Sequence, residues 1–446
     1  MKNVKITLWV LLLGLSIAWL FATPPLNSPI TYFAFRDVFI QYSGIIAIAA
    51  MSVSMILAVR PVFMENFFNG LDKMYRLHKW LGISALTLAV LHWWFAKGTK
   101  WMVGWGWLSR PERRPGGDAG QTLSTLESFF RSQRGLAETI GEWTFYVAVL
   151  LIALALIKRF PYHLFKKTHK FLAIAYLLLA YHSVILIKNQ YWGQPIGWIM
   201  AVLLVLGSVA AFLVLFKQVG KKRQAAATIE SLQYYPELKV LEIDVLAADA
   251  WQGHKAGQFA FATSKTTEGA HPYTIASAWN PADKHIKFVI KELGDHTKTL
   301  SEQLSVGQTV TLEGPYGRFD FEDNKSRQIW IGAGIGITPF IAQMRHLATE
   351  PDGKEIDFFH TTKEVSELAL SKLKADTAAA QIDLHLLIDA KDGYLTAEKI
   401  QAAVPDWQNA SVWFCGPSTF GAKLKTDLIK AGLNPNDFHQ EEFALR

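Results

Sequence analysis

Four histidines lie inside two long apolar stretches of the chain, where ionisable side chains are uncommon. His78 and His92 share one stretch, and His169 and His182 share the other. Placing an imidazole in a membrane span costs roughly several kcal/mol unless it binds something, so such residues indicate function. At about 1.5 Å of rise per residue, steps of 14 and 13 residues separate the members of each pair by roughly 20 Å. The histidines therefore fall at two levels, near the two edges of a hydrocarbon core.

Neutral imidazole is a good axial ligand for haem iron. Two facing helices would hold two stacked b-type haems, one between His78 and His169 and the other between His92 and His182. The alternative is that the histidines only line the helices and bond to carbonyl groups. The nearly equal spacing favours haem ligation, because both stretches would run the same way across the bilayer. A 13-residue step misses the starting helical face by roughly 140°, so the second helix must bend, bulge or cross obliquely, or the ligands reach from different sides.

Composition limits what else the chain can be. Its 446 residues are enough for two or three domains, and 50% are hydrophobic, mostly in the first half. The only cysteine, Cys415, excludes an internal disulfide and a four-cysteine iron–sulfur or zinc site. The net charge of +7 is modest and forms no clustered basic face, so nucleic-acid binding is not expected.

Six apolar segments are long enough to be membrane spans, although the first could instead be a signal peptide. The fourth is short. They are residues 6–22, 38–59, 77–96, 143–157, 171–187 and 195–216.

The distribution of basic residues predicts the orientation of these spans. Lysines and arginines fill the short loop at 158–170 and follow the last span at 217–223, so both are expected to be cytoplasmic. The loop at 98–140 is then outside, although it carries several basic residues. Its tryptophans suit a helix in the membrane interface; they are Trp101, Trp105 and Trp107. Arg36, at the outer end of the second span, could neutralise a haem propionate or polarise an acceptor, but anchoring in head groups is the favoured interpretation.

The second half has the pattern of soluble domains. After a linker at 217–227, short alternating runs separated by turn residues predict a small antiparallel β-barrel. From residue 328, strands alternate with helices, which predicts a parallel, doubly wound α/β sheet. We therefore expect a transmembrane haem domain at 1–220, a β-barrel domain at 221–325 and an α/β domain at 326–446.

Two motifs in the predicted barrel suit a flavin. A Tyr or His can stack on its rings, a Thr hydroxyl can bond its polar edge, and a helix start can offer N–H groups to pyrophosphate. A barrel turn containing proline would look similar. The candidate residues are His271, Pro272, Tyr273, Thr274 and Ser277 in the first motif, and Gly294, His296 and Thr297 in the second.

A glycine-rich loop joins a strand to a helix at 332–339. Gly332, Gly334 and Gly336 let backbone amides approach a phosphate, and Thr338 can cap a helix that starts at Pro339. The spacing is not the usual dinucleotide fingerprint, and an ordinary turn is the alternative.

The last strand of the α/β domain ends at Cys415, Gly416 and Pro417, which should fall in the crevice at the carboxyl ends of the strands. Cys415 is either a contact of a nicotinamide or a small buried hydrophobic residue.

The chain resembles the ferric reductase and NADPH oxidase family of membrane flavocytochromes, because the paired histidines and the soluble motifs occur in the same order as in that family. The soluble half is similar to the ferredoxin–NADP reductase superfamily. The resemblance implies FAD stacked at His271–Thr274, with Gly294 to Thr297 near its pyrophosphate, and NAD(P)H held by Gly332–Pro339 and Cys415–Pro417. Tyr273 replaces the usual phenylalanine. An aromatic residue near the family's C-terminus often covers the flavin, and Phe443 is the candidate, although three residues follow it.

The implied activity is transmembrane electron transfer. Electrons from cytoplasmic NAD(P)H would pass through FAD and two haems to an acceptor outside, either oxygen, as in a superoxide-forming oxidase, or ferric iron. The alternative is a haem-containing membrane subunit that donates electrons to a periplasmic partner protein docked on the loop at 98–140. Thr361, Thr362 and Lys363 could bind a 2′-phosphate, which favours NADPH, although a solvated loop explains them nearly as well.

Overall fold

The computed structural model describes residues 2–26, 28–68, 70–109, 125–157, 159–265 and 269–441. The described residues form two compact units. The helical unit contains those up to 68 and from 73 to 219, and the α/β unit contains those at 70–72 and from 220 onward.

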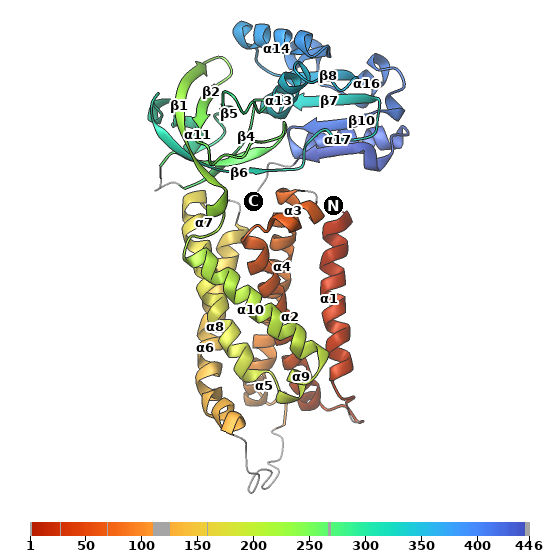
Figure 1. Ribbon diagram of the computed structural model, residues 1–446. Helices are drawn as coiled ribbons and strands as arrows, with labels where there is room; N and C mark the ends of the chain where they lie inside the picture. The colour runs from red at the N-terminus through yellow and green to blue at the C-terminus, as the bar shows by residue number, and fades with distance from the viewer. Residues whose placement is uncertain are drawn as a thin grey trace. The chain divides into compact units, whose positions relative to one another are not determined.

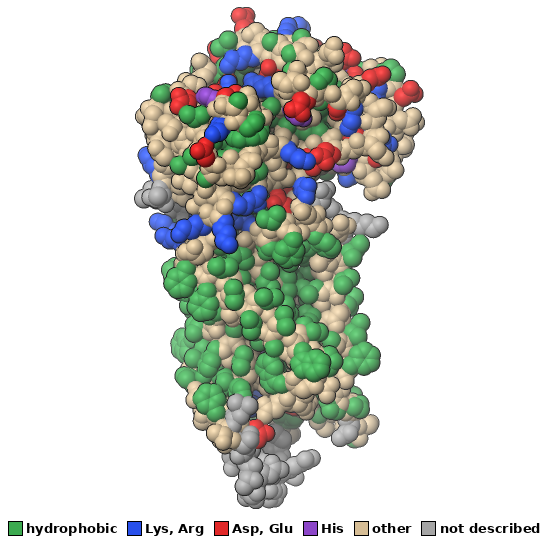
Figure 2. Space-filling model, viewed as in Figure 1, with side chains coloured by type: hydrophobic (Ala, Val, Ile, Leu, Met, Phe, Trp, Pro, Cys, Tyr) green, Lys and Arg blue, Asp and Glu red, His purple; other side chains and the backbone are tan. Residues whose placement is uncertain are grey.

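Helices of 4 to 32 residues make up the helical unit (Figure 1). They are α1 (Lys2–Ala22), α2 (Tyr32–Ala58), α3 (Val62–Phe68), α4 (Leu71–Trp93), α5 (Thr99–Gly104), α6 (Thr125–Leu156), α7 (Tyr162–His169), α8 (Phe171–Leu186), α9 (Asn189–Trp192) and α10 (Pro195–Leu215). Side chains from α2, α8 and α10 form its buried core, including Ile46, Tyr176 and Met200. Hydrophobic side chains also cover much of the face of this unit that Figure 2 shows. Trp9 is 60% exposed and Trp198 is 64% exposed, as expected for helices that face lipid rather than water.

Five helices are long and apolar enough to cross a membrane, among the described residues. They are Asn3–Ala22, Tyr32–Ala58, Glu127–Leu156, Leu164–Leu186 and Pro195–Leu215. The remaining predicted span, 77–96, corresponds to α4, which does not meet this standard. We attribute the difference to Arg76, Lys79 and the two histidines, which make α4 less apolar although it has 23 residues.

Two helices differ from the sequence-based expectation in ways that matter for the histidines. The fourth span is not short, because α6 begins at Thr125 and runs for 32 residues. The second histidine stretch is divided at one residue: α7 ends at His169 and α8 begins at Phe171, and with Lys170 between them they make up the candidate span Leu164–Leu186. The backbone N–H of Ala173 donates to the Lys170 carbonyl at 3.1 Å, so the chain makes a tighter, 3₁₀-type turn just after His169.

α4 is followed directly by a π-helix, Trp94–Gly98. The guanidinium of Arg36, on α2, binds this wider turn. Its Nε donates to the carbonyl of Phe95 at 2.8 Å and to Oγ1 of Thr99 at 3.0 Å, and Nη2 donates to the carbonyl of Ala96 at 3.1 Å. Arg36 therefore fastens the segment that follows His92 to α2.

The first part of the α/β unit is an antiparallel sheet in the order β4-β3-β6-β1-β2-β5. Its strands are β1 (Gln224–Tyr235), β2 (Val240–Ala247), β3 (Phe259–Thr263), β4 (His271–Thr274), β5 (His285–Lys291) and β6 (Thr309–Tyr316), with the short helices α11 (Asp295–Lys298) and α12 (Leu300–Gln303). The antiparallel pairing agrees with the prediction, and among the described residues an Ile275–Phe288 bridge links the two edges of the sheet. The linker predicted to reach residue 227 is wrong, because β1 already begins at Gln224 and pairs with both β2 and β6.

The second part is a five-stranded parallel sheet in the order β11-β10-β7-β8-β9. Its strands are β7 (Arg327–Ala333), β8 (Glu355–Thr362), β9 (Asp383–Ile388), β10 (Ser411–Cys415) and β11 (Phe438–Glu441); its helices are α13 (Thr338–Leu347), α14 (Glu367–Ala379), α15 (Asp389–Asp392), α16 (Ala397–Ala403) and α17 (Ser418–Lys430). The strand order reverses between β7 and β10, and a crevice at such a point is where open α/β sheets bind ligands.

Candidate functional site

The four histidines form two pairs in the helical unit. The ring centroids of His78 and His169 lie 5.9 Å apart, and those of His92 and His182 lie 6.4 Å apart. α4 supplies one member of each pair, whereas the partners come from the end of α7 and from α8.

Backbone carbonyls orient three of the four imidazoles. Nδ1 of His78 donates to the carbonyl of Ser54 at 2.9 Å, and Nδ1 of His92 donates to that of Ile40 at 2.9 Å. Nδ1 of His182 donates to the carbonyl of Ala137 at 2.7 Å. With the proton on Nδ1, each of these rings keeps an unprotonated Nε2, the nitrogen that can bind a metal. Nδ1 of His169 is buried without a hydrogen-bond partner among the residues that the structure describes.

This geometry fits an iron porphyrin. Two metal–nitrogen bonds of about 2 Å, plus about 1 Å from each nitrogen to its ring centre, give a centroid separation of roughly 6 Å. No group of three or more His, Cys, Asp or Glu side chains among the described residues could hold a bare metal ion. A porphyrin supplies four equatorial nitrogens itself and needs only two axial imidazoles from the protein.

The predicted flavin residues meet at β4 and α11. The rings of His271 and His296 stack with centroids 3.8 Å apart, and the Tyr273 hydroxyl is hydrogen-bonded to Nε2 of His296 at 3.0 Å. Thr274 and Ser277 are buried, and Oγ of Ser277 accepts from the backbone N–H of Lys287 at 3.1 Å.

The start of α11 is organised by the side chain of Thr297. The helix is a single turn, and Oγ1 of Thr297 accepts from the backbone N–H of Leu293 at 2.9 Å and of Gly294 at 3.1 Å. These two N–H groups lie just before the helix, and the placement of a pyrophosphate near Gly294 to Thr297 stays a prediction.

The glycine loop and the end of β10 lie against each other at the reversal of strand order. A Cβ on Gly336 would lie 2.2 Å from the carbonyl oxygen of Cys415, and one on Gly416 would lie 2.7 Å from Cβ of Ala333. Gly334 has φ +56°, which favours glycine. The loop thus needs glycines for close backbone packing, and Gly332 precedes it on β7.

Thr338 plays a different part from the predicted cap. α13 begins at Thr338 rather than at Pro339, and Oγ1 of Thr338 donates to the carbonyl of Ile335 at 2.8 Å. The hydroxyl therefore tightens the preceding turn instead of accepting from the helix.

Cys415 is fully buried, and burial raises the pKa of its thiol well above the usual value. It packs among apolar side chains such as Phe319 and Phe340, as a small hydrophobic residue would. Pro417 directly precedes α17. Phe443 lies outside the described residues.

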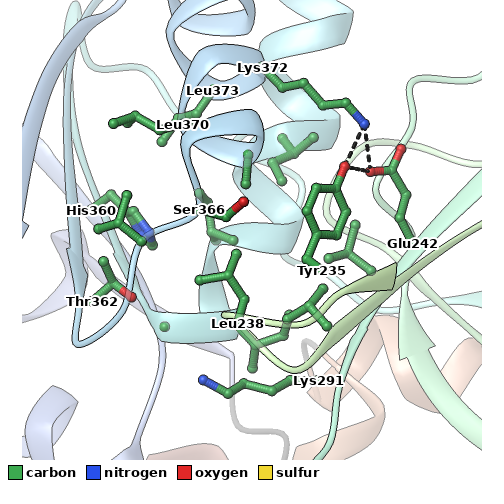
Figure 3. Close-up of a pocket in the computed structure, with 18 of the residues that line it drawn as sticks. Tyr235, Leu238, Glu242, Lys291, His360, Thr362, Ser366, Leu370, Lys372 and Leu373 are labelled. Carbon is green, nitrogen blue, oxygen red and sulfur yellow. Dashed lines mark hydrogen bonds and ion pairs between the residues drawn. The ribbon is translucent and has the colours of Figure 1, made fainter. Parts of the chain in front are cut away.

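The α/β unit contains a pocket, part of whose lining Figure 3 shows. Gly334, Ile335 and the end of β8 form one side, and outward side chains of β2 and β5 form another. Lys372, from α14, donates to the Tyr235 hydroxyl at 2.5 Å and pairs with Glu242 at 3.2 Å. These contacts hold a helix of the parallel-sheet part against β1 and β2 of the antiparallel sheet.

His360 lines this pocket and was not singled out in the sequence. Its Nδ1 donates to the carbonyl of Gly332 at 3.0 Å. Burial lowers the pKa of His360 to about 4, although the hydrogen bond opposes this, so the ring is neutral and Nε2 is an acceptor. A histidine at the carboxyl end of a predicted parallel strand is the signal that could have identified it.

The segment proposed for a 2′-phosphate is only partly available. The hydroxyl of Thr361 is buried and donates to Asp389 at 3.1 Å, whereas Thr362 lines the pocket. Trp101, Trp105 and Trp107 in the predicted outer loop are exposed, and α5 ends between the first two.

Comparison with known families divides the chain at the same place as its two units. Residues 43–180 match the family described as "Ferric reductase like transmembrane component", and residues 224–320 match the family described as "FAD-binding domain". The first match includes His78, His92 and His169, and it ends two residues before His182.

Curated relatives match about two fifths of the chain. The glycine betaine monooxygenase reductase subunit of Chromohalobacter salexigens is 24% identical over 187 residues, which are 38% of this chain and 50% of that protein. The respiratory burst oxidase homolog protein E of Arabidopsis thaliana is 24% identical over 233 residues, which are 44% of this chain and 23% of that protein. This chain spans about half the length of the first relatives that it matches.

Solved structures resemble the chain at low identity. The flavohemoglobin of Malassezia yamatoensis, with bound FAD and heme, has a TM-score of 0.45 at 19% identity and covers 72% of this chain and 89% of its own. A ferredoxin reductase in carbazole 1,9a-dioxygenase has a TM-score of 0.42 at 19% identity and covers 49% of this chain and 69% of its own.

Proposed function

We propose that this chain, which joins a ferric reductase-like transmembrane component to an FAD-binding domain, is an NAD(P)H-dependent transmembrane oxidoreductase. It would carry electrons from NAD(P)H through FAD and two b-type haems to an acceptor on the opposite side of the membrane. The observation that carries this proposal is the pairing of four histidines, with centroid separations of 5.9 Å and 6.4 Å, at two levels of one helical unit.

The role of the helical residues is to bind and orient. His78 and His169 would hold one haem, and His92 and His182 the other. When bound, the haems would supply one-electron carriers at two depths, while the carbonyls of Ser54, Ile40 and Ala137 keep the protons on Nδ1.

The α/β unit would hold the hydride donor and its acceptor. We assign FAD to His271–Thr274 with Ser277 and the segment from Gly294 to Thr297. NAD(P)H is assigned to Gly332, Gly334, Gly336, Thr338 and Pro339 on one side of the crevice and to Cys415–Pro417 on the other. We keep the functional division at 1–220, 221–325 and 326–446.

We place six spans in the membrane, counting α4 with the five more apolar helices. Basic residues between the fourth and fifth spans and after the last span support a cytoplasmic α/β unit, by the positive-inside rule. His78 and His169 then lie near the cytoplasm, and His92 and His182 near the outside.

The acceptor is proposed to be oxygen or ferric iron. A second candidate, electron donation to a periplasmic partner protein, is supported by exposed Trp105 and Trp107, which are 57% and 69% exposed. The same side chains suit the membrane interface, so direct reduction of oxygen or ferric iron remains the main proposal.

The decisive experiment is a reduced-minus-oxidised spectrum of the purified chain with flavin extraction, followed by acceptor screening. We expect a b-type haem signal with two haems and one FAD per chain, and oxygen or ferric-chelate reduction without a partner protein. A colourless, correctly folded preparation made with adequate haem supply would refute the proposal. Turnover on NADPH and NADH decides the donor, and a tenfold or greater preference for NADH would rule out the NADPH assignment.

A further inference from the structure

Both histidines of the proposed outer pair lie directly against a glycine of a neighbouring helix. A Cβ on Gly141, in α6, would lie 2.0 Å from Nδ1 of His182 and 2.4 Å from Cε1. A Cβ on Gly44, in α2, would lie 3.1 Å from Cε1 of His92 and 3.2 Å from Nδ1. The first separation is impossible for a real side chain, and the second is tighter than ordinary contact.

The two glycines occupy the same position relative to the carbonyl that each imidazole binds. His182 donates to the carbonyl of Ala137, four residues before Gly141, and His92 donates to the carbonyl of Ile40, four residues before Gly44. In an α-helix the residue at i+4 stands above the carbonyl of residue i, so its Cβ would cover that oxygen. A glycine there leaves a notch in which a ring can lie on the helix backbone.

The proposed inner pair is built differently. His78 donates to the carbonyl of Ser54, but the residue four positions later is Ala58, and Nδ1 of His169 has no partner within the described part of the chain. The glycine at i+4 is therefore not needed for every imidazole–carbonyl bond. It is needed where the ring lies close to the helix, as both outer rings do.

We propose that Gly141 and Gly44 are positioning residues of the outer haem site, and that their notches set where His182 and His92 present Nε2. This inference rests on the proposed function and adds that the two haem sites differ in construction. An alanine at position 141 should push His182 out of place, whereas one at position 44 should shift His92 by only a few tenths of an ångström.

The test compares four glycine-to-alanine variants of the full chain. Gly141→Ala and Gly44→Ala are the test variants. Gly135→Ala, also on α6, and Gly82→Ala, on α4, are matched controls, because no atom of another described residue lies within 4 Å of a Cβ at either position. Haem content per chain, the low-temperature optical spectrum and the electron paramagnetic resonance of the oxidised protein are measured.

We expect the haem content of Gly141→Ala to be roughly one per chain instead of two, with the signal of the inner haem retained. Gly44→Ala should keep two haems with an altered outer signal, and both controls should match the wild type. Two unaltered haem signals in Gly141→Ala would overturn the inference while leaving the proposed function intact. A wild-type chain that binds no haem would overturn the proposed function.

A second measurement separates a notch effect from general misfolding and does not depend on haem. In the His182→Ala background the ring is absent, so adding Gly141→Ala should not lower the thermal unfolding midpoint further. An additive loss in the double variant would show that Gly141 acts independently of His182 and would contradict the inference.

Discussion

At the scale of single residues, the neutral His360 ring makes stability depend on pH. Its folded pKa is about 4, mainly because of burial, and its unfolded pKa is about 6.5. Between these two pH values the unfolded chain binds a proton that the folded chain does not. The contribution of the neutral His360 ring to the free energy of unfolding is therefore fully present above about pH 6.5 and is lost as the pH falls toward 4. The loss is on the order of 3 kcal/mol.

We expect the thermal unfolding midpoint of the purified full chain to decrease as the pH is lowered from 7 to roughly 4.5. Unfolding is measured by flavin fluorescence. His360→Gln should flatten this dependence, since glutamine does not titrate. An identical slope in His360→Gln would contradict the assignment.

The buried thiol of Cys415 gives a second prediction at this scale. Burial raises its pKa and denies access to reagents, so the thiolate that reacts with maleimides is scarce in the folded protein. We expect labelling to be at least tenfold slower in the native chain than in the unfolded chain. No other cysteine is present to confuse the readout. Rapid native labelling would show that this end of β10 opens readily.

Residue types and spacing predicted which side chains lie close together, but they predicted less well which hydrogen bonds each side chain makes. The 14- and 13-residue steps indicated the two histidine pairs, which the structure brings within 6.4 Å. The roles of Thr297 and Thr338 could not be predicted, because a hydroxyl at a helix start can accept or donate. The choice depends on local backbone geometry, which placed Thr338 as a donor to Ile335.

At the scale of elements, Arg36 and the π-helix form one structural feature. Three hydrogen bonds from a charged guanidinium hold carbonyls and a hydroxyl of the segment from Phe95 to Thr99. Hydrogen bonds to charged groups are each worth about 1.5–3 kcal/mol. We expect Arg36→Met to lower the free energy of unfolding of the purified chain by at least about 1.5 kcal/mol, the value of one such bond. Thermal unfolding measures this loss, and the haem spectrum should also change.

The matched control is the neighbouring ion pair between Lys188 and Asp37. Its partners are 37% and 64% exposed, so Lys188→Met should cost less than about 1 kcal/mol. Equal losses in the two variants would mean that Arg36 only anchors its helix at the surface, as the sequence alone suggested.

Element boundaries were harder to predict than element types. The apolar runs located the spans, yet α6 begins 18 residues before its expected start at residue 143, since its first turns are polar and expose their side chains. The alanines at 225–227 looked like a linker because alanine has low strand propensity. In the sheet, Ala225 and Ala227 are only 4% and 2% exposed; both pair with β6, and Ala227 also pairs with β2, so small residues are accommodated there.

At the scale of the whole molecule, the order of its parts was predictable because each has its own hydrophobic period. Long apolar helices, alternating strands and βα repeats follow one another along the chain, and the structure has them in that order. α4 is the exception. The histidines that give this helix its proposed function also lower its hydropathy, so composition understates the span that matters most.

The last prediction separates the two halves of the proposed relay. If electrons leave the α/β unit through the histidine pairs, removing an outer ligand should stop transmembrane transfer without affecting hydride uptake. We expect His92→Leu or His182→Leu, in sealed vesicles, to reduce an acceptor on the side opposite to NAD(P)H at less than roughly a tenth of the wild-type rate. Reduction of a soluble acceptor on the same side, supplied directly by the flavin, should stay within about twofold.

The control is His285→Gln, on β5, whose ring bonds to Asp244 and lies outside the assigned sites. It should preserve both rates. Full transfer across the membrane by both outer-ligand variants would mean that electrons do not pass between His92 and His182. Loss of the same-side reaction as well would mean that these rings support the fold of the whole chain, because nothing in the proposed relay couples an outer imidazole to hydride uptake in the α/β unit.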